Sequence, residues 1–332
     1  MDSANKWFGF AATYVVLDLL FLWFGAMQLR RFPMEAFKAW SLYACLVLLF
    51  GLCLAAGFAA PRDWLAAKLH GAAGISCSLA VFLLPYLFYC AGAGDFRWIA
   101  FAKLLALAAL PFGLFALAPV RERTRLNWQD VIVLAWLMLP VLTGQIAGIW
   151  TKPVNLDFMT RAFLVGVGSW SFLIWRGVEN SGYEFRFSRT LARDAAVNFA
   201  GFAAVAIPLG LAMHFIGWNP HWRGIQAFVF DYVTIFLFVA ILEELFFRGL
   251  IQNLLEGSLG SRYGAQGITS VLFGFSHILH APFPNWRYVA LATLAGWFYG
   301  SAYRSHRSLM ASASTHALVD TLWRTFFTVG RL

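Results

Sequence analysis

Acidic and histidine side chains gather in the last third of this 332-residue sequence, inside segments that are otherwise apolar. The chain has 16 Asp and Glu residues, most of them in polar connections. The acids inside apolar segments are Asp18, Asp231, Glu243, Glu244 and Asp320. Ionisable groups in membrane segments are costly and tend to mark functional sites. Apart from Asp18, these acids share the end of the chain with His277, His280 and His316, which indicates proton-transfer or hydrolytic chemistry.

Two adjacent glutamates, Glu243 and Glu244, follow an apolar run, and Arg248 comes one helical turn after the second. Residues four apart share a helix face, so Glu244 and Arg248 can neutralise each other. Glu243 is rotated by about 100° and has no such partner, so it is available as a general base. The alternative is that the helix ends here and both glutamates face lipid headgroups.

Two further pairs with the same spacing follow in the next apolar segments. Phe273 places an aromatic ring one turn from His277, a side chain suited to proton transfer. His316 and Asp320 share one face among small residues, which permit close helix approach. These polar groups need partners inside a membrane, so they mark a reaction site, a structural hydrogen bond or a proton relay. We interpret His280, at the end of its segment, as interfacial.

The composition of the chain and its apolar runs indicate that membrane-spanning helices position these residues. Hydrophobic residues make up 61% of the chain and charged residues only 12%, whereas soluble domains carry roughly a quarter charged residues. Apolar runs of about 20 residues, long enough to span a bilayer, recur at 8–28, 39–60, 71–94, 98–120, 130–150, 161–175, 195–218, 226–247, 263–280, 286–303 and 308–327. No strand pattern occurs, and open sheets are excluded from lipid. We therefore expect an all-α, polytopic transmembrane bundle of about eleven spans.

The polar, amphipathic segment 176–194 divides the chain. It predicts an N-terminal transmembrane bundle of unknown role, 1–190, and a C-terminal domain, 191–332, that holds the candidate residues. The segment itself is either an interfacial helix or latch or an ordinary loop.

The net charge of +9 comes from basic residues scattered through short connections. This distribution is typical of membrane proteins and favours contact with anionic lipid over nucleic acid. The four cysteines, Cys45, Cys53, Cys77 and Cys90, lie in apolar runs with no CxxC pair. We expect free thiols rather than disulfides or a zinc knuckle.

The ordered motifs EExxxR, FxxxH and HxxxD, each on a separate membrane segment, resemble the CPBP family. That family contains type II CAAX prenyl endopeptidases and bacteriocin-processing or immunity proteins. The matching residues are Glu243, Glu244, Arg248, Phe273, His277, His316 and Asp320, and the run Gly296, Gly300, Tyr303, Ser308-Leu309 is similar as well. The resemblance covers about 231–327, and nothing before residue 190 takes part.

The resemblance implies an intramembrane endopeptidase that cleaves a membrane-anchored protein or peptide, in a bacterial inner membrane or its equivalent, without a cofactor. Glu243, helped by His277, would activate a water molecule. His316 and Asp320 would hold the developing oxyanion, with Glu244, Arg248 and Phe273 in support. An ionised Asp320 cannot donate a hydrogen bond, so it must be protonated or must orient His316.

Three other functions remain open. In a zinc protease, Glu243, His277, His316 and Asp320 would be ligands, although HExxH is absent. In a proton-coupled transporter, Asp231, Glu243, His277 and Asp320 would form a relay, although transporters usually have repeated halves and only one half here carries the charge. A non-catalytic immunity protein would keep the motifs without activity. Serine and cysteine proteases are excluded, because GxSxG is absent and every cysteine lies far along the chain from His277, His280 and His316.

Overall fold

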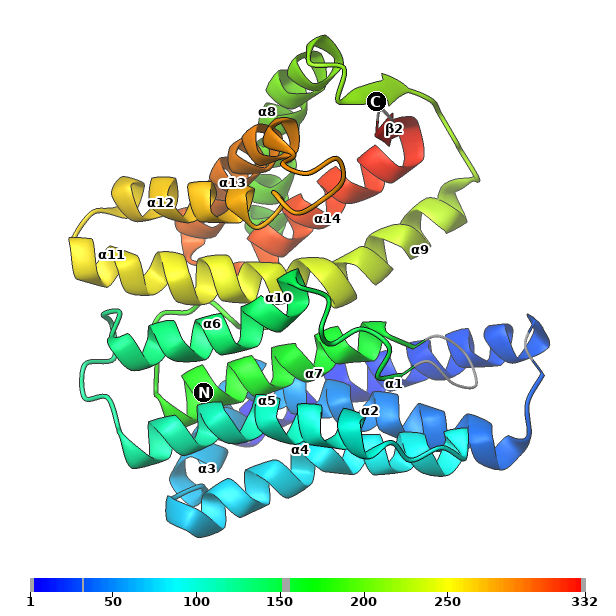
Figure 1. The fold of residues 1–332 in the computed structure, drawn as a ribbon, viewed down its shortest axis with the longest axis vertical. Helices are drawn as coiled ribbons and strands as arrows, with labels where there is room; N and C mark the ends of the chain where they lie inside the picture. The colour runs from blue at the N-terminus through cyan, green and yellow to red at the C-terminus, as the bar shows by residue number, and fades with distance from the viewer. Residues whose placement is uncertain (1–2, 32, 151–155, 330–332) are drawn as a thin grey trace. The chain divides into compact units, whose positions relative to one another are not determined.

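The computed structural model describes residues 3–31, 33–150 and 156–329, which are predominantly helical (Figure 1). The chain forms two compact units. Unit 1 comprises Met1–Arg123 and Asn127–Val178, and unit 2 comprises Thr124–Leu126 and Glu179–Leu332. All of the residues that carry the EExxxR, FxxxH and HxxxD motifs belong to unit 2.

Unit 1 is a bundle of apolar helices around an aromatic core. Its elements are α1 (Ser3–Arg31), α2 (Ala36–Gly57), α3 (Ala59–Lys68), α4 (Gly71–Ala93), α5 (Trp98–Leu117), α6 (Trp128–Leu142), α7 (Phe158–Ser169) and the π-helical turn η1 (Trp170–Trp175). Phe82 of α4 is fully buried. Its ring centroid lies 5.2–5.9 Å from those of Phe112, Phe163 and Trp170. Such tilted and edge-on contacts between rings stabilise a core beyond the area that they bury.

Unit 2 is built on one long continuous helical segment, to which four further helices are added. Its elements are α8 (Arg189–Ala212), β1 (Ile216–Trp218), α9 (Ile225–Ile235), η2 (Phe236–Ala240), α10 (Ile241–Glu244), η3 (Leu245–Gln252), α11 (Asn253–Leu259), α12 (Arg262–Phe275), α13 (Trp286–His306), α14 (Leu309–Phe326) and β2 (Phe327–Val329). The elements α9 to α11 follow one another without a break and form the rod α9–α11 (Figure 1). The four added helices are α8, α12, α13 and α14. The π-helical segments η2 and η3 flank the two glutamates, and π-turns inside helices are frequent at functional sites.

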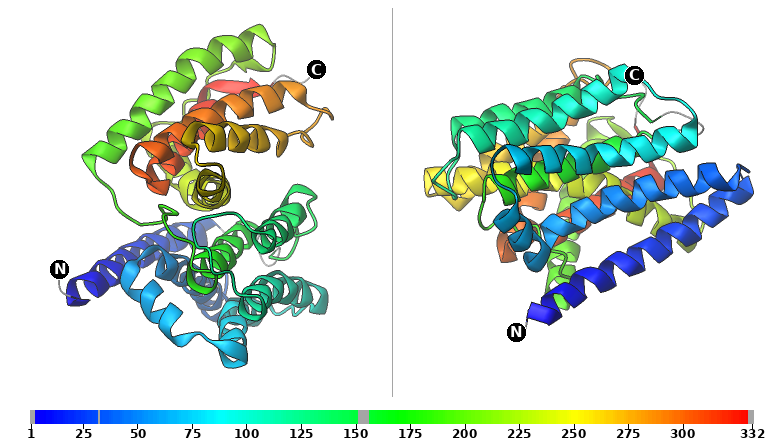
Figure 2. Two further views of the ribbon diagram at one scale, coloured as in Figure 1. Left: turned by 90° about the vertical axis from the view of Figure 1, so that its left-hand side faces the viewer. Right: turned by 90° about the horizontal axis from the view of Figure 1, so that it is seen from below.

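The helices α8, α13 and α14 lie side by side in unit 2 (Figures 1 and 2). The strands β1 and β2 pair antiparallel, with Ile216 opposite Val329, so the end of α14 is fastened to the segment after α8. Helices α12 and α13 approach closely at Gly274. A Cβ atom there would lie 2.7 Å from the carbonyl oxygen of Val289, so only glycine permits the contact that sets α12 against α13.

Seven helices among the described residues are long and apolar enough to cross a membrane. They are Trp7–Met27, Ala36–Gly57, Gly71–Ala93, Trp98–Leu117, Phe158–Trp175, Arg189–Ala212 and Ile225–Leu259, and Trp128–Leu142 is a shorter apolar helix. The chain is therefore an integral, multi-pass membrane protein, and the expected all-α class is confirmed. The expected count of about eleven spans is not confirmed, because helices such as α12, with 14 residues, are short for a bilayer core of about 30 Å.

One fully buried ion pair lies in the apolar interior of unit 1, between Asp130 at the start of α6 and Arg176 just after η1. Nε of Arg176 donates to Oδ1 of Asp130 at 2.9 Å, and Nη2 donates to Oδ2 at 3.3 Å. The backbone N–H of Asn127 also donates to Oδ2, at 2.9 Å. The sequence pattern did not single out this pair, because Asp130 and Arg176 each stand at the edge of an apolar segment.

We expect Asp130→Asn to lower the free energy of unfolding by about 3–5 kcal/mol, because it leaves the buried guanidinium of Arg176 without a countercharge. Thermal unfolding of the purified protein in detergent measures the effect. Glu35→Gln is the control, since it removes only the exposed Glu35–Lys38 pair at 3.3 Å, and exposed pairs contribute about 0–1 kcal/mol. Equal melting temperatures of the two variants would contradict the prediction.

Candidate active site

The carboxylate of Glu244 is fully buried in unit 2 and is bound on several sides. Nη1 of Arg248 donates to its Oε1 at 2.8 Å, so the predicted pair is present. Nδ1 of His316 lies 2.8 Å from the same oxygen, and Oγ of Ser312 lies 2.5 Å from Oε2. A buried carboxylate is tolerated only with such partners. Glu244 thus joins the rod α9–α11 to two residues of α14.

Arg248 extends this network to α12 and α13. Its Nη2 donates to the carbonyl oxygen of Gly296 at 3.0 Å. Its guanidinium carbon lies 4.6 Å from the ring centroid of Phe273 and 5.3 Å from that of Tyr299. Aromatic faces attract a guanidinium at these distances. Phe273, which the sequence placed in a supporting role, therefore contacts the arginine of the first motif.

His316 lies between the buried network and two carboxylates that are partly open. Its ring stacks on Tyr299, with 4.6 Å between centroids and 15° between planes. While Nδ1 faces Glu244, Nε2 lies 3.5 Å from Oδ2 of Asp320 and 3.9 Å from Oε2 of Glu243. The stacking and the Nδ1 contact together fix the direction in which Nε2 points.

Glu243 and Glu244 differ sharply in exposure, although they are neighbours in sequence. The side chain of Glu243 is 31% exposed, whereas that of Glu244 is fully buried. Adjacent helical residues point about 100° apart, so one carboxylate faces the packed interior and the other faces the open side of His316. This difference matches the distinction between an available and an anchored glutamate that the spacing predicts.

His277 lies in the turn after α12, which ends at Phe275, rather than inside a helix extending to residue 280 as the sequence suggested. Its Nδ1 lies 2.9 Å from the carbonyl oxygen of Phe273 and 3.1 Å from Oγ of Ser276. Because Nδ1 is engaged by the backbone, Nε2 is left to accept a proton or to bind a water molecule. The ring also packs against Phe273, 4.9 Å between centroids.

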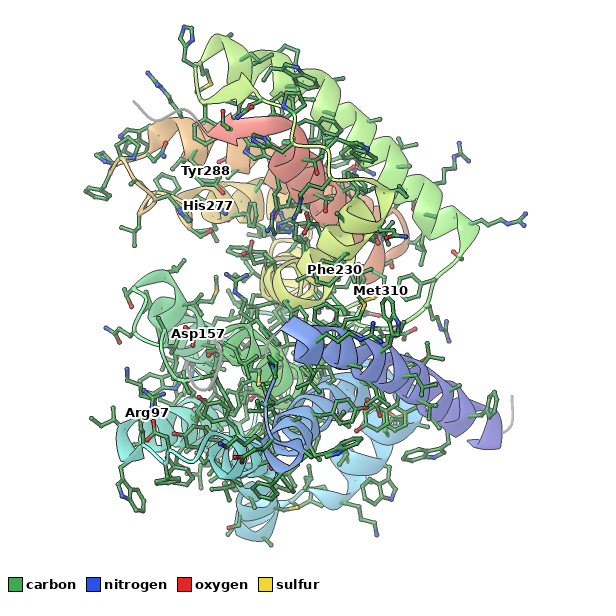
Figure 3. The ribbon with its side chains drawn as sticks, turned by 90° about the vertical axis from the view of Figure 1, so that its right-hand side faces the viewer. Arg97, Asp157, Phe230, His277, Tyr288 and Met310 are labelled. Carbon is green, nitrogen blue, oxygen red and sulfur yellow. The ribbon has the colours of Figure 1, made fainter. Side chains whose placement is uncertain are left out.

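Tyr288 of α13 joins this group, although no motif contains it. Its ring centroid lies 4.6 Å from that of His277 and 5.1 Å from that of His280 (Figure 3). His280, interpreted as interfacial, has its ring 5.7 Å from that of His277. His277 of the second motif therefore lies in one group of rings with Tyr288 and His280.

Sequence reasoning missed Ser312, Tyr299 and Tyr288. A signal existed for Ser312, because it precedes His316 by four residues, the spacing that also joins His316 to Asp320. Tyr299 and Tyr288 carried no such signal, since each contacts a histidine on a different element. Asp231, considered for a proton relay, lies elsewhere and contacts Arg223 and Arg324.

Among the described residues, no three His, Cys, Asp or Glu side chains are grouped in a way that could hold a metal ion. Glu243, His316 and Asp320 do come together, but through contacts of 3.5 and 3.9 Å that centre on one imidazole nitrogen.

Comparison with known proteins yields one family. Residues 225–322 match the family model described as Type II CAAX prenyl endopeptidase Rce1-like. Searches of the curated proteins and of the solved structures found no match. The matched segment begins with α9, ends within α14, and contains every residue of the three motifs. The part of the chain that holds the site is therefore similar to the Rce1-like family of type II CAAX prenyl endopeptidases.

Proposed function

We propose that the chain is a membrane-embedded endopeptidase in which the Glu243 carboxylate activates water. Glu243 takes a proton from a water molecule while the water oxygen attacks the carbonyl carbon of a peptide bond. His277, through its Nε2, helps to orient that water. This division of roles rests on the geometry of the two glutamates, since Glu243 is open on one side while Glu244 is committed to Arg248 and His316.

His316 and the protonated carboxyl of Asp320 donate the hydrogen bonds that stabilise the oxyanion formed when the carbonyl π electrons move to oxygen. Hydrogen-bond donors aimed at that oxygen are often the largest single contribution to acyl-transfer catalysis. When the intermediate collapses, the C–N bond breaks and the amine nitrogen takes the proton held by Glu243. The carboxylate is restored, and the products are an amine and a carboxylic acid.

The observation that carries the proposal is the fixed orientation of His316. Its Nδ1 is 2.8 Å from Glu244, and its face is covered by Tyr299, so Nε2 is directed toward Glu243 and Asp320. Catalysis by preorganised dipoles requires donors that are held in place before the charge develops. The network of Glu244, Arg248 and Ser312 supplies that support.

The substrate class is inferred from the family description together with the membrane setting. A C-a-a-X motif is a C-terminal tetrapeptide whose cysteine carries a prenyl group. A peptide anchored in this way presents its cleavage site close to the membrane surface. We propose a lipid-anchored peptide or protein that is cut near its C-terminus.

We expect Glu243→Gln to lower kcat by a factor of about 10²–10⁴, because the base is lost, while the melting temperature stays near that of the wild type. Glu244→Gln should lower activity and also the free energy of unfolding, by about 3 kcal/mol or more, because the fully buried Arg248 loses its countercharge. Cleavage of a prenylated C-a-a-X peptide and thermal unfolding in detergent measure the two effects.

The matched control is Glu184→Gln, which removes an exposed glutamate that pairs with Arg186 at 3.4 Å. It should change neither activity nor stability measurably. Wild-type turnover by Glu243→Gln would exclude Glu243 as the base. If Glu243→Gln were the less stable variant, the roles assigned to the two glutamates would be reversed.

Asp320→Asn separates this mechanism from a zinc-dependent one. An amide donates a hydrogen bond at every pH, whereas the carboxyl of Asp320 donates only while it is protonated. The Asp320→Asn variant should therefore keep activity within about tenfold of the wild type and extend it toward alkaline pH. Asp320→Leu should lose about 10²–10³-fold, the effect of removing one oxyanion donor.

The pH profile of peptide cleavage, with and without a chelator, is the measurement. In a zinc site, replacing an anionic ligand by an amide would weaken the binding of the metal. The Asp320→Asn variant would then be inactive, and the chelator would inhibit the wild type. That combination would overturn the glutamate mechanism.

A further inference from the structure

A second polar cluster lies at the far end of α14 from the buried network. It consists of Asp231 on α9, Arg223 in the loop before α9, and Arg324 on α14. Arg223 donates to Oδ2 of Asp231, and Nη1 of Arg324 lies 3.8 Å from Oδ1. Asp231 is buried, while the two arginine side chains are 59% and 60% exposed.

The charges in this cluster do not balance. The single carboxylate of Asp231 pairs with the guanidinium groups of both Arg223 and Arg324. No other described carboxylate forms an ion pair with either arginine. Arg324 is the weaker partner, because its contact of 3.8 Å is too long for a hydrogen bond. Most of its five N–H donors therefore remain available. An arginine held in this way is suited to bind a carboxylate in two-pronged fashion.

Arg324 continues a polar line that starts at the proposed active site. His316, Asp320 and Arg324 are spaced by four residues on α14, so each is turned by only about 40° from the one before. Their side-chain exposures rise along the line, from 4% to 40% to 60%. The line therefore leads from the buried imidazole toward the surface over about 12 Å, at a rise of 1.5 Å per residue.

That length matches the end of a peptide that carries a C-terminal C-a-a-X motif. Three residues lie beyond the cysteine, and three extended residues span about 10 Å. We propose that Arg324, positioned by Asp231, binds the free C-terminal carboxylate of the substrate and so sets the distance from chain end to cleavage site. This inference rests on the proposed function, but neither Arg324 nor Arg223 lies in the matched segment 225–322.

The surroundings of Arg324 carry aromatic side chains of the kind that is enriched at membrane interfaces. Phe326, two residues later, stacks with Trp218 and Trp222 at 5.7 and 6.2 Å between centroids, and both tryptophans are exposed. Exposed tryptophans are enriched at the level of lipid headgroups. A lipid-anchored peptide would bring its carboxylate to that level. An anionic headgroup shares this chemistry, but it would not require the alignment of Arg324 with His316 and Asp320.

The test uses the full chain in phosphatidylcholine vesicles and two prenylated peptides that differ only at the C-terminus, one a free acid and one a carboxamide. We expect the wild type to cleave the acid with a kcat/KM about tenfold or more above that of the amide, mainly through KM, since a hydrogen-bonded charged group is lost. Arg324→Gln should lower kcat/KM for the free-acid peptide to the value for the carboxamide peptide. It should leave kcat/KM for the carboxamide peptide unchanged. Arg324→Lys, which keeps the charge, should restore part of the preference.

Arg262→Gln is the matched control, because Arg262 is 63% exposed and pairs with Glu256 at 3.1 Å, at the end of α12 opposite to His277. It should keep the full preference for the acid. The inference is overturned if the wild type cleaves acid and amide equally well, or if Arg324→Gln slows both peptides alike. It is also overturned if the effect of Arg324→Gln appears only with added phosphatidylglycerol, which would indicate a lipid site. Cleavage of neither peptide would instead count against the proposed function.

Discussion

The buried carboxylate of Glu244 is the contact on which the arrangement of unit 2 depends. A charge without partners in an apolar interior is strongly unfavourable, so the helices must bring donors to it. They do so from different parts of the chain, with Arg248 from the same rod and Ser312 and His316 from α14. Because Arg248 also binds Gly296 of α13 and faces Phe273 of α12, one charge determines how four elements meet.

This constraint separates the two adjacent glutamates by geometry alone. Once Glu244 points into the packed interior, the helical repeat turns Glu243 about 100° away, toward the side where His316 presents Nε2. The helical repeat alone is therefore enough to bury Glu244 and to leave Glu243 partly exposed. The π-helical segments η2 and η3 on either side of α10 shift the register of the rod locally, which adjusts where each carboxylate emerges.

The sequence predicted the contacts that lie within one helix and failed where two elements meet. The Glu244–Arg248 pair and the common face of His316 and Asp320 result from a spacing of four residues, which the helical repeat alone decides. The stacking of Tyr299 on His316 and the approach of Tyr288 to His277 depend on the packing of α13 against its neighbours, which spacing does not encode. Helix α12 ends at Phe275, before His277, because the chain forms a turn there. Hydropathy did not indicate that helix end. The expected number of spans is not confirmed, because hydropathy does not distinguish a crossing helix from a shorter helix buried among others.

The two units show how a buried charge that serves structure differs from one that serves chemistry. In unit 1, Asp130 and Arg176 are both fully buried and pair with each other, so the pair is not open to a ligand from solvent. In unit 2, Glu244 is likewise buried and paired, with Arg248 and His316. Glu243 and Asp320 remain partly open around His316, and Asp231 is outnumbered by arginines at the other end of α14. A site that binds a polar substrate needs such incompletely paired groups, because an ion pair that is already fully hydrogen-bonded forms no new favourable interaction when the substrate binds.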